Sequence, residues 1–225
     1  GDEMAILLDA DVVQLPQSLE GKISLRAQHL EAYQNKRLAI RYRKLVDAIE
    51  DLTLKEAVAK GYHKLLSYKD EYEVARLHLS TASKAAETFE GDLKLTYHLA
   101  PPMLSKTGAD GRPMKKEFGA GMLRGFKILA KMKCLRGTLF DPFGRTAERR
   151  MERALIAQFE ADMKVVLSKA DPQTMEAVLA LAELPLSIRG FGMVKEANER
   201  KAAKRREELL SVIQQGGLDL SAAAE

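Results

Sequence analysis

The period of the apolar residues constrains this chain more than any other feature. From Ser24 onward, apolar side chains recur every three to five residues, the spacing of a helix that buries one face. This spacing predicts one helix from Ser24 to about Glu50. It predicts further helices over residues 53–79, 82–90, 122–133, 146–169, 172–185 and 192–215. The fold class is therefore mainly α, and we expect a multi-helix orthogonal bundle.

One segment has a different period. Between residues 93 and 99, apolar side chains alternate with polar ones, which is typical of a β-strand. Turn residues follow at 108–112, and residues 114–118 can form a returning strand. We therefore expect one small β-hairpin near residues 92–118 within the otherwise helical fold.

Three local signals mark particular positions in the predicted helices. Thr53 followed by Glu56 is a capping-box pattern, which predicts that Thr53 begins a helix. Asp171 followed by Pro172 is typical of an N-cap and the first helical position. Gly61 lies inside a helical run, where glycine costs about 1 kcal/mol relative to alanine. We therefore expect a kink or a close helix crossing at Gly61.

The composition excludes several classes of protein. The chain is 46% hydrophobic and 30% charged, with 6% aromatic residues and no tryptophan, which favours a helix-rich soluble protein over a barrel or sandwich. Its 36 basic and 32 acidic residues give a net charge of +4, which does not require a nucleic-acid partner. No run reaches the roughly 18 apolar residues of a membrane helix, so we expect no membrane partner.

The chain contains a single cysteine, Cys134. One thiol cannot form an internal disulfide, a thiolate zinc site or an iron–sulfur cluster held by this chain alone. A reducing, cytoplasmic location is the expected setting. The helical spacing around Cys134 predicts that its side chain is buried.

The sequence lacks the common patterns of catalytic and metal sites. Its histidines are never four residues apart, and no Gly-x-Ser-x-Gly segment occurs. We therefore expect neither catalytic residues nor a metal site within this chain. The histidines are His29, His63, His78 and His98.

Three polar clusters are candidate interdomain or ligand contacts, and the alternative is that they brace helices against one another. The first crowds charges of both signs and two tyrosines into two helical turns. The second places arginines at a helix start, where they oppose the helix dipole, so we expect Arg145 or Arg149 to have an acidic partner elsewhere. The third is a tight glycine loop with one arginine. The candidate residues are Tyr68, Lys69, Asp70, Glu71, Arg76, Asp141, Arg145, Arg149 and Arg189.

In four segments the sequence resembles the C-terminal helical region of the fused bacterial indolepyruvate ferredoxin oxidoreductases. The segments are YKDEYEVARL, HLAPPML followed by GRPMKKEFG, DPFGRTAERR and IRGFGMVKEAN. The helix through Tyr33 and Tyr42 resembles the end of the preceding gamma-type domain. The implied organisation is an extension (1–22), the gamma-type helix (23–52), a helical C-terminal domain (53–215) and a disordered tail (216–225).

The resemblance implies a reaction that this chain cannot complete alone. The family decarboxylates aryl 2-oxoacids oxidatively to acyl-CoA, with thiamine diphosphate as cofactor and ferredoxin as electron acceptor. The family's Gly-Asp-Gly segment is replaced here by Gly91-Asp92-Leu93, and Cys134 is solitary. We therefore expect thiamine diphosphate, magnesium and iron–sulfur clusters in the rest of the enzyme. The chain would be a noncatalytic module or subunit, with thiamine-binding and iron–sulfur domains or subunits as partners.

Two alternative functions remain open from the sequence. The charged helices could dock ferredoxin or another partner through a basic run on the last helix. The weaker alternative is a helical nucleic-acid-binding protein, although we do not expect a nucleic-acid partner. The basic run consists of Lys201, Lys204, Arg205 and Arg206.

Overall fold

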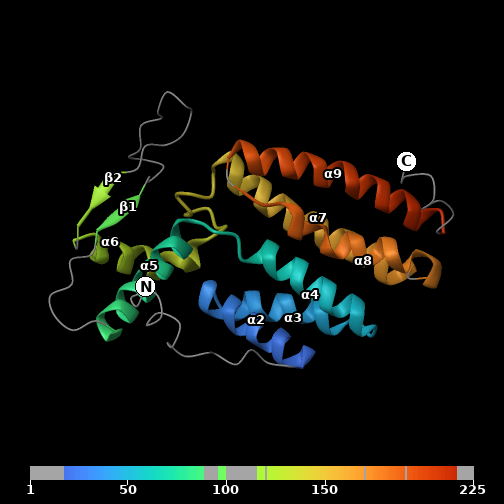
Figure 1. The fold of residues 1–225 in the computed structure, drawn as a ribbon, viewed down its shortest axis with the longest axis horizontal. Helices are drawn as coiled ribbons and strands as arrows, with labels where there is room; N and C mark the ends of the chain where they lie inside the picture. The colour runs from blue at the N-terminus through green and yellow to red at the C-terminus, as the bar shows by residue number, and fades with distance from the viewer. Residues whose placement is uncertain are drawn as a thin grey trace, which may run out of the picture. The chain divides into compact units, whose positions relative to one another are not determined.

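The computed structural model describes residues 18–88, 96–99, 116–119, 121–169, 171–190 and 192–216. Most of these residues lie in helices (Figure 1), which confirms the mainly α class. The chain divides into two compact units, which we call unit 1 (Gly1–Ser67 with Arg150–Glu225) and unit 2 (Tyr68–Arg149). The division falls after residues 67 and 149, and the domain boundary after residue 52 that the resemblance implies stays a prediction.

Unit 1 is assembled from two separate stretches of sequence, and α4 is its central helix. α4 packs against α2, α3, α8 and η3, while α8 also packs against α9. Eight α4 residues are buried, as this central position requires. The elements are α2 (Leu19–Tyr33), α3 (Lys36–Asp47), α4 (Leu52–Leu66), most of α7 (Ala147–Lys169), η2 (Pro172–Thr174), α8 (Met175–Glu183), η3 (Leu184–Ser187) and α9 (Met193–Gln214).

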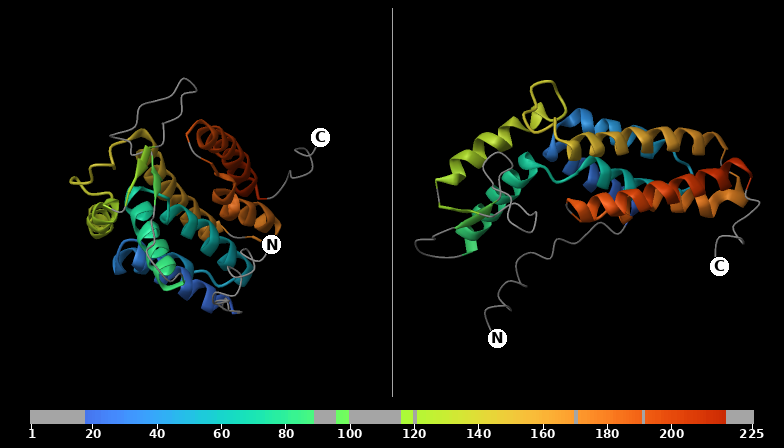
Figure 2. Two further views of the ribbon diagram at one scale, coloured as in Figure 1. Left: turned by 60° about the vertical axis from the view of Figure 1, so that its left-hand side comes forward. Right: turned by 90° about the horizontal axis from the view of Figure 1, so that it is seen from above.

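Two ion pairs hold α7 and α9 side by side in unit 1 (Figure 2). Lys195 on α9 pairs with Glu152 on α7, and Arg206 Nε donates to Asp162 Oδ2 at 2.6 Å. The pairs are ten residues apart on α7 and eleven apart on α9, or about 15 and 17 Å at 1.5 Å per residue. Contacts spaced almost equally along both helices keep their axes aligned, which differs from the orthogonal packing expected from the sequence.

An aromatic stack fills the middle of unit 1. The ring of Tyr62 lies between those of Tyr42 and Phe159, at centroid distances of 6.0 and 5.6 Å. All three side chains are buried. The stack therefore joins α3, α4 and α7 through one continuous apolar contact.

The prediction of one helix from Ser24 to Glu50 is wrong, because the chain breaks after Tyr33. Asn35 caps the second helix, α3, by accepting a hydrogen bond from the Leu38 N–H at 3.1 Å. An asparagine side chain competes well for such an N–H, which favours a new helix start. Apolar spacing does not reveal this break, since both helices bury a face in the same core.

The boundaries around α4 also differ from the prediction. Asp51, and not Thr53, is the N-cap, because its Oδ1 accepts from the Leu54 N–H at 2.7 Å. The predicted helix over 53–79 ends at Leu66, and α5 (Glu71–Thr88) begins after a four-residue connection and includes most of the predicted helix over 82–90. The Asp171 cap is confirmed, with its Oδ1 accepting from the Gln173 N–H at 2.9 Å.

Unit 2 is built on α5 and α6 (Met122–Lys131), which pack against each other. Ala75, Tyr97 and Phe126 form its apolar core. The strands β1 (Tyr97–Leu99) and β2 (Lys116–Phe118) pair antiparallel, and the 3-10 helix η1 (Met132–Leu135) follows α6.

Several predictions concern residues outside the described ranges. The connection between β1 and β2 is among them, so the hairpin near residues 92–118 as a whole stays a prediction. Residues 1–17 of the expected extension and 217–225 of the expected tail also lie outside. Within the described ranges, none of the helices has both the length and the apolar character needed to cross a membrane.

Gly61 lies where α4 meets α8 at close range. A Cβ atom placed on Gly61 would lie 2.1 Å from the backbone oxygen of Ala182. Real Cβ atoms do not approach backbone that closely, so only glycine allows this spacing. The close helix crossing predicted at Gly61 is confirmed.

Replacing Gly61 by alanine should therefore destabilise the protein despite the better helix propensity of alanine. We expect Gly61→Ala to lower the free energy of unfolding by about 1–3 kcal/mol, because α4 and α8 must separate. Urea denaturation followed by circular dichroism measures this change.

Gly125→Ala is the matched control, since the new Cβ on α6 would meet only Met122 Sδ at 3.8 Å. It should be neutral or stabilise by up to about 1 kcal/mol. Equal destabilisation by both substitutions would contradict the role of Gly61.

Candidate functional site

A buried ion pair lies at the start of α5 in unit 2. Asp70 and Arg136 are only 3% and 5% exposed. Arg136 Nη2 donates to Asp70 Oδ1 at 2.9 Å, and Arg136 Nε donates to the other carboxylate oxygen. Asp70 Oδ1 also accepts from the Glu73 N–H at 2.9 Å. The pair therefore fastens the N-terminus of α5 to the residue that follows η1.

Asp141 organises the loop between η1 and α7. Its carboxylate accepts hydrogen bonds from the Tyr72 hydroxyl at 2.9 Å, the Gly137 N–H at 2.8 Å and the Phe143 N–H at 3.1 Å. Burial, together with the bond to Asp141, raises the pKa of Tyr72. A Cβ atom on Gly144 would lie 2.6 Å from Asp141 Oδ2, so the loop folds back on this carboxylate too closely for a side chain.

Arg149 has the acidic partner expected from its place at a helix start. Its Nε lies 3.7 Å from Glu71 Oε2, and its guanidinium lies over the Tyr68 ring at 5.5 Å from the centroid. Burial raises the pKa of Glu71. The prediction of an acidic partner is confirmed for Arg149.

The nine predicted residues do not form a single site. Five of them join a buried assembly that we call the unit 2 network. It consists of Tyr68, Asp70, Glu71, Tyr72, Arg136, Asp141 and Arg149. Arg76 bonds within its own helix, donating to Glu73 Oε2 and Oε1 at 2.8 and 2.6 Å. Lys69 and Arg145 are exposed.

Arg189 belongs to unit 1, and so is not part of the unit 2 network. Its side chain is exposed, and its Nε donates to the Leu186 carbonyl at 2.8 Å. Asn198 Nδ2 donates to the Arg189 carbonyl at 2.8 Å. These two bonds stabilise the turn that follows η3, so Arg189 has a structural role in that turn.

Sequence reasoning missed two central members of the unit 2 network. Tyr72 belongs to the first polar cluster but is not among its candidate contacts, and Arg136 lies outside all three clusters. A signal for Arg136 exists: it directly precedes Gly137 at the end of a helical run with no acidic residue near it in the sequence. An arginine so placed must find a carboxylate from elsewhere or remain in water.

The chemistry of the unit 2 network is that of a structural anchor. Its carboxylates face guanidinium groups, a phenol and backbone N–H groups, which hold them in place. Across the described residues, no group of three or more His, Cys, Asp or Glu side chains is arranged to hold a metal ion.

Cys134 is exposed, so the predicted burial of its thiol is wrong. The chain changes from an α-helix to the 3-10 helix η1 at Met132. A 3-10 helix has three residues per turn, which rotates later side chains away from the α-helical face. The apolar period of α6 therefore cannot be extended as far as Cys134.

The ionic contacts of α7 complete the polar structure of unit 1. Arg41 donates to both oxygens of Glu160 at 2.6 and 2.9 Å, and the Tyr62 hydroxyl donates to Glu160 Oε1. Burial acts to raise the pKa of Glu160, but the bonds from Arg41 and Tyr62 outweigh it and lower the pKa. Each of the three α7 carboxylates that cross to another helix thus meets a cation.

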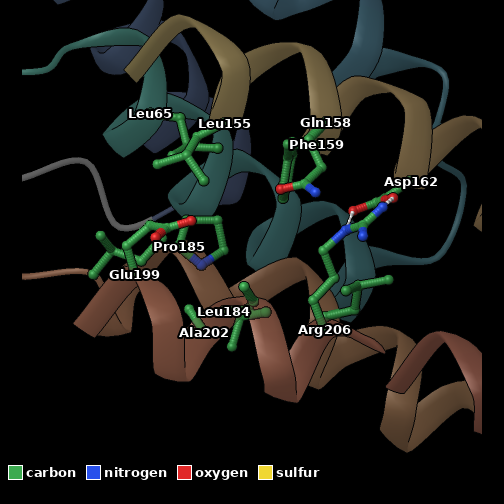
Figure 3. Close-up of a pocket in the computed structure, with 13 residues that line it drawn as sticks. Leu65, Leu155, Gln158, Phe159, Asp162, Leu184, Pro185, Glu199, Ala202 and Arg206 are labelled. Carbon is green, nitrogen blue, oxygen red and sulfur yellow. Dashed lines mark hydrogen bonds and ion pairs between the residues drawn. The ribbon is translucent and has the colours of Figure 1, made fainter. Parts of the chain in front are cut away.

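One small pocket opens between these helices, with the Asp162–Arg206 pair at its edge (Figure 3). Its walls are mainly apolar, and its volume is about 40 Å³. At 10–15 Å³ for each water, it holds about three waters and no organic substrate. The lining residues are Leu65, Leu155, Gln158, Phe159, Asp162, Leu181, Leu184, Pro185, Ile188, Glu199, Ala202, Ala203 and Arg206.

Two histidines of unit 1 lie against each other. His29 Nδ1 and His63 Nε2 are 3.0 Å apart, so one ring nitrogen must accept a hydrogen bond from the N–H of the other. Burial, together with the neighbouring His29, lowers the pKa of His63 to about 4. His63 is therefore neutral near pH 7.

The comparisons with known proteins give a family without an assigned role. Residues 19–208 match the family model described as "Family of unknown function (DUF6537)". The match covers most of the chain, which therefore belongs to this family. Neither the curated proteins nor the solved structures include a match to this chain.

Removing the guanidinium group of Arg136 from the unit 2 network should destabilise the protein strongly. Arg136→Met leaves Asp70 buried without its main partner, and we expect a loss of about 3–5 kcal/mol in the free energy of unfolding. Arg205→Met is the control, because its pair with Glu208 is exposed and should contribute less than about 1 kcal/mol. Chemical denaturation measures both. Similar losses in the two variants would contradict a buried anchor.

The pKa of His63 also predicts how stability depends on pH. The ordinary value is 6.5 and the folded value is about 4, so the unfolded chain binds the proton first as the pH falls. Stability should be complete above pH 6.5 and fall by up to about 3 kcal/mol toward pH 4, at about 1.4 kcal/mol per pKa unit. Urea denaturation at several pH values measures this loss.

His63→Gln is the control for this prediction, since it keeps a polar side chain without a titrating ring. Its stability should vary less with pH between 6.5 and 5, with a residual slope from His78, whose pKa burial also lowers. A wild-type protein equally stable at pH 7 and pH 5 would show that His63 is not buried in the neutral form.

Proposed function

We propose that this member of the DUF6537 family is a noncatalytic module or subunit of a cytoplasmic, thiamine-diphosphate-dependent aryl 2-oxoacid:ferredoxin oxidoreductase. The basis is the resemblance of four segments to the helical region of the indolepyruvate enzymes. In that reaction a 2-oxoacid is decarboxylated oxidatively to acyl-CoA, and ferredoxin receives the electrons. This chain contributes structure to the enzyme, while the cofactors are held elsewhere.

The observation that carries the proposal is the meeting of two of these segments. Tyr72, from YKDEYEVARL, donates its hydroxyl proton to Asp141, from DPFGRTAERR, at 2.9 Å. Glu71 and Arg149 join the same two segments a second time. Segments about 70 residues apart thus have matching polar residues because they pack together. This supports a shared scaffold as the source of the resemblance.

The pocket in unit 1 is too small to be the substrate or cofactor site of the proposed enzyme. A space of about 40 Å³ cannot enclose an aryl 2-oxoacid or thiamine diphosphate. The polar side chains at its edge, Asp162 and Arg206, already bind each other.

The structure does not favour the basic run of α9 as a docking site for ferredoxin or nucleic acid. Arg206 binds Asp162 on α7, and Arg205 binds Glu208 within α9 at 2.9 Å. Two of the four cations are thus engaged internally, and a phosphate or an acidic protein would have to compete for them.

Reconstitution tests the proposed function. The full chain is mixed with the thiamine-binding and iron–sulfur chains of an indolepyruvate ferredoxin oxidoreductase that lacks its own C-terminal helical region. We expect a stable complex by size-exclusion chromatography with light scattering, and faster indolepyruvate-dependent reduction of ferredoxin. Neither association nor a change in the rate would reject the proposal.

The double variant Lys201→Glu/Lys204→Glu is the control for this experiment. If α9 docks a partner through its charges, the variant should lose binding, and wild-type binding should weaken steeply with salt. For a packed subunit contact elsewhere, we expect the variant to bind as the wild type does.

A further inference from the structure

The loop between η1 and α7 carries two large apolar side chains in solvent. Leu139 is 86% exposed and Phe140 is 80% exposed. The two residues are adjacent, so they form a continuous apolar tip. Single exposed apolar residues are common on protein surfaces, but an aromatic residue beside a leucine at one loop tip is typical of a binding anchor.

The tip is held in place by the backbone and side-chain bonds of its loop. The Asp141 carboxylate accepts from Gly137 on one side of the tip and from Phe143 on the other. The Asp141 N–H also donates to the Thr138 carbonyl at 3.2 Å, which closes the turn. A loop organised in this way presents its tip without a large loss of entropy on binding.

One cation lies beside the tip, and three more lie on the helix that precedes it in the chain. The outer face of α6 carries Arg124, Lys127 and Lys131 at positions i, i+3 and i+7, all exposed. Arg145 Nη2 lies 3.4 Å from the Leu139 carbonyl, directly beside the tip. No acidic residue occurs in the sequence from residue 118 to residue 140, so the segment that carries α6 and the tip has an excess of positive charge.

We propose that the Leu139–Phe140 tip and these cations form a docking surface for an acidic protein that has an apolar pocket. The tip enters the pocket, and the cations attract the acidic surface around it. The inference goes beyond the proposed function by naming a surface and the chemistry of its partner. It rests on the proposed function only for the choice of oxidoreductase chains as one probe.

An anionic membrane fits this surface less well than a protein does. A helix that lies in a membrane interface turns its apolar face toward the lipid. The apolar face of α6 is already used, since Phe126 is 2% exposed and belongs to the core of unit 2. The face of α6 that remains available is mainly cationic, with Ile128 also 62% exposed on it.

The test measures binding of the full chain by biolayer interferometry. The probes are an acidic ferredoxin, the thiamine-binding and iron–sulfur chains named above, and vesicles with 30% phosphatidylserine. We expect wild-type protein to bind at least one protein probe. Leu139→Ser/Phe140→Ser should weaken that binding by about 30-fold or more, the effect of losing an anchor residue.

Two control variants separate this surface from general effects. Ile40→Ser/Leu52→Ser removes two exposed apolar side chains of unit 1, which are 56% and 68% exposed, and should leave binding within about two-fold of wild type. Lys127→Glu/Lys131→Glu should slow association and reduce its salt dependence, whereas Lys201→Glu should not. Thermal denaturation confirms that each variant is folded.

The outcomes distinguish this inference from the proposed function. Binding to ferredoxin through the tip, without binding to the oxidoreductase chains, rejects the proposed function and supports the docking surface. Equal binding by wild type and Leu139→Ser/Phe140→Ser overturns the docking surface alone. Absence of binding to every protein probe overturns both. Binding only to vesicles, lost in the tip variant, replaces the protein partner with a membrane.

Discussion

The close approach of α4 and α8 at Gly61 sets the geometry of unit 1. α4 contacts most of the other elements of this unit, so its distance from α8 fixes where its remaining side chains point. Tyr62, the next residue, stacks on Phe159 and donates to Glu160 on α7. A single backbone contact therefore determines the position of the aromatic stack and of the polar bond that joins α4 to α7. The pocket beside Phe159 is the small space that these packed helices leave unfilled.

Unit 2 relies on buried polar contacts to a greater extent. Among the residues that the structure describes, its apolar core has three buried members with partly buried apolar residues packed against them, and the same unit contains the unit 2 network. The attraction within a buried ion pair offsets little more than the free energy that its charges lose on leaving water, but the geometry of the pair is specific. The network thus selects one arrangement of α5 and the following loop, which an apolar cluster of this size would leave less defined. The same loop geometry holds Leu139 and Phe140 in solvent.

The sequence predicts the helices better than it predicts their ends and long-range partners. The apolar period locates α6, α7 and α9, and Asp171 and Gly61 act as their residue types predict. The break at Asn35 is not visible, because the period continues through it. The exposure of Cys134 depends on a change to 3-10 geometry that residue types do not signal. The sequence does not reveal that the partner of Arg136 is Asp70, which lies 66 residues earlier. Contacts at that separation are set by tertiary packing, which spacing within one helix does not encode.

Because unit 1 is built from two separate stretches of sequence, its two parts are synthesised at different times. The helices α2, α3 and α4 leave the ribosome well before α7, α8 and α9, which cover them. At about 5–20 residues per second, synthesis of the intervening residues takes on the order of ten seconds. During this interval Tyr62 lacks Phe159 and Glu160, its partners on α7, while unit 2 is contiguous and can fold as it emerges. Early folding of unit 2 would bring Ser67 and Arg150 together and shorten the loop that unit 1 has to close.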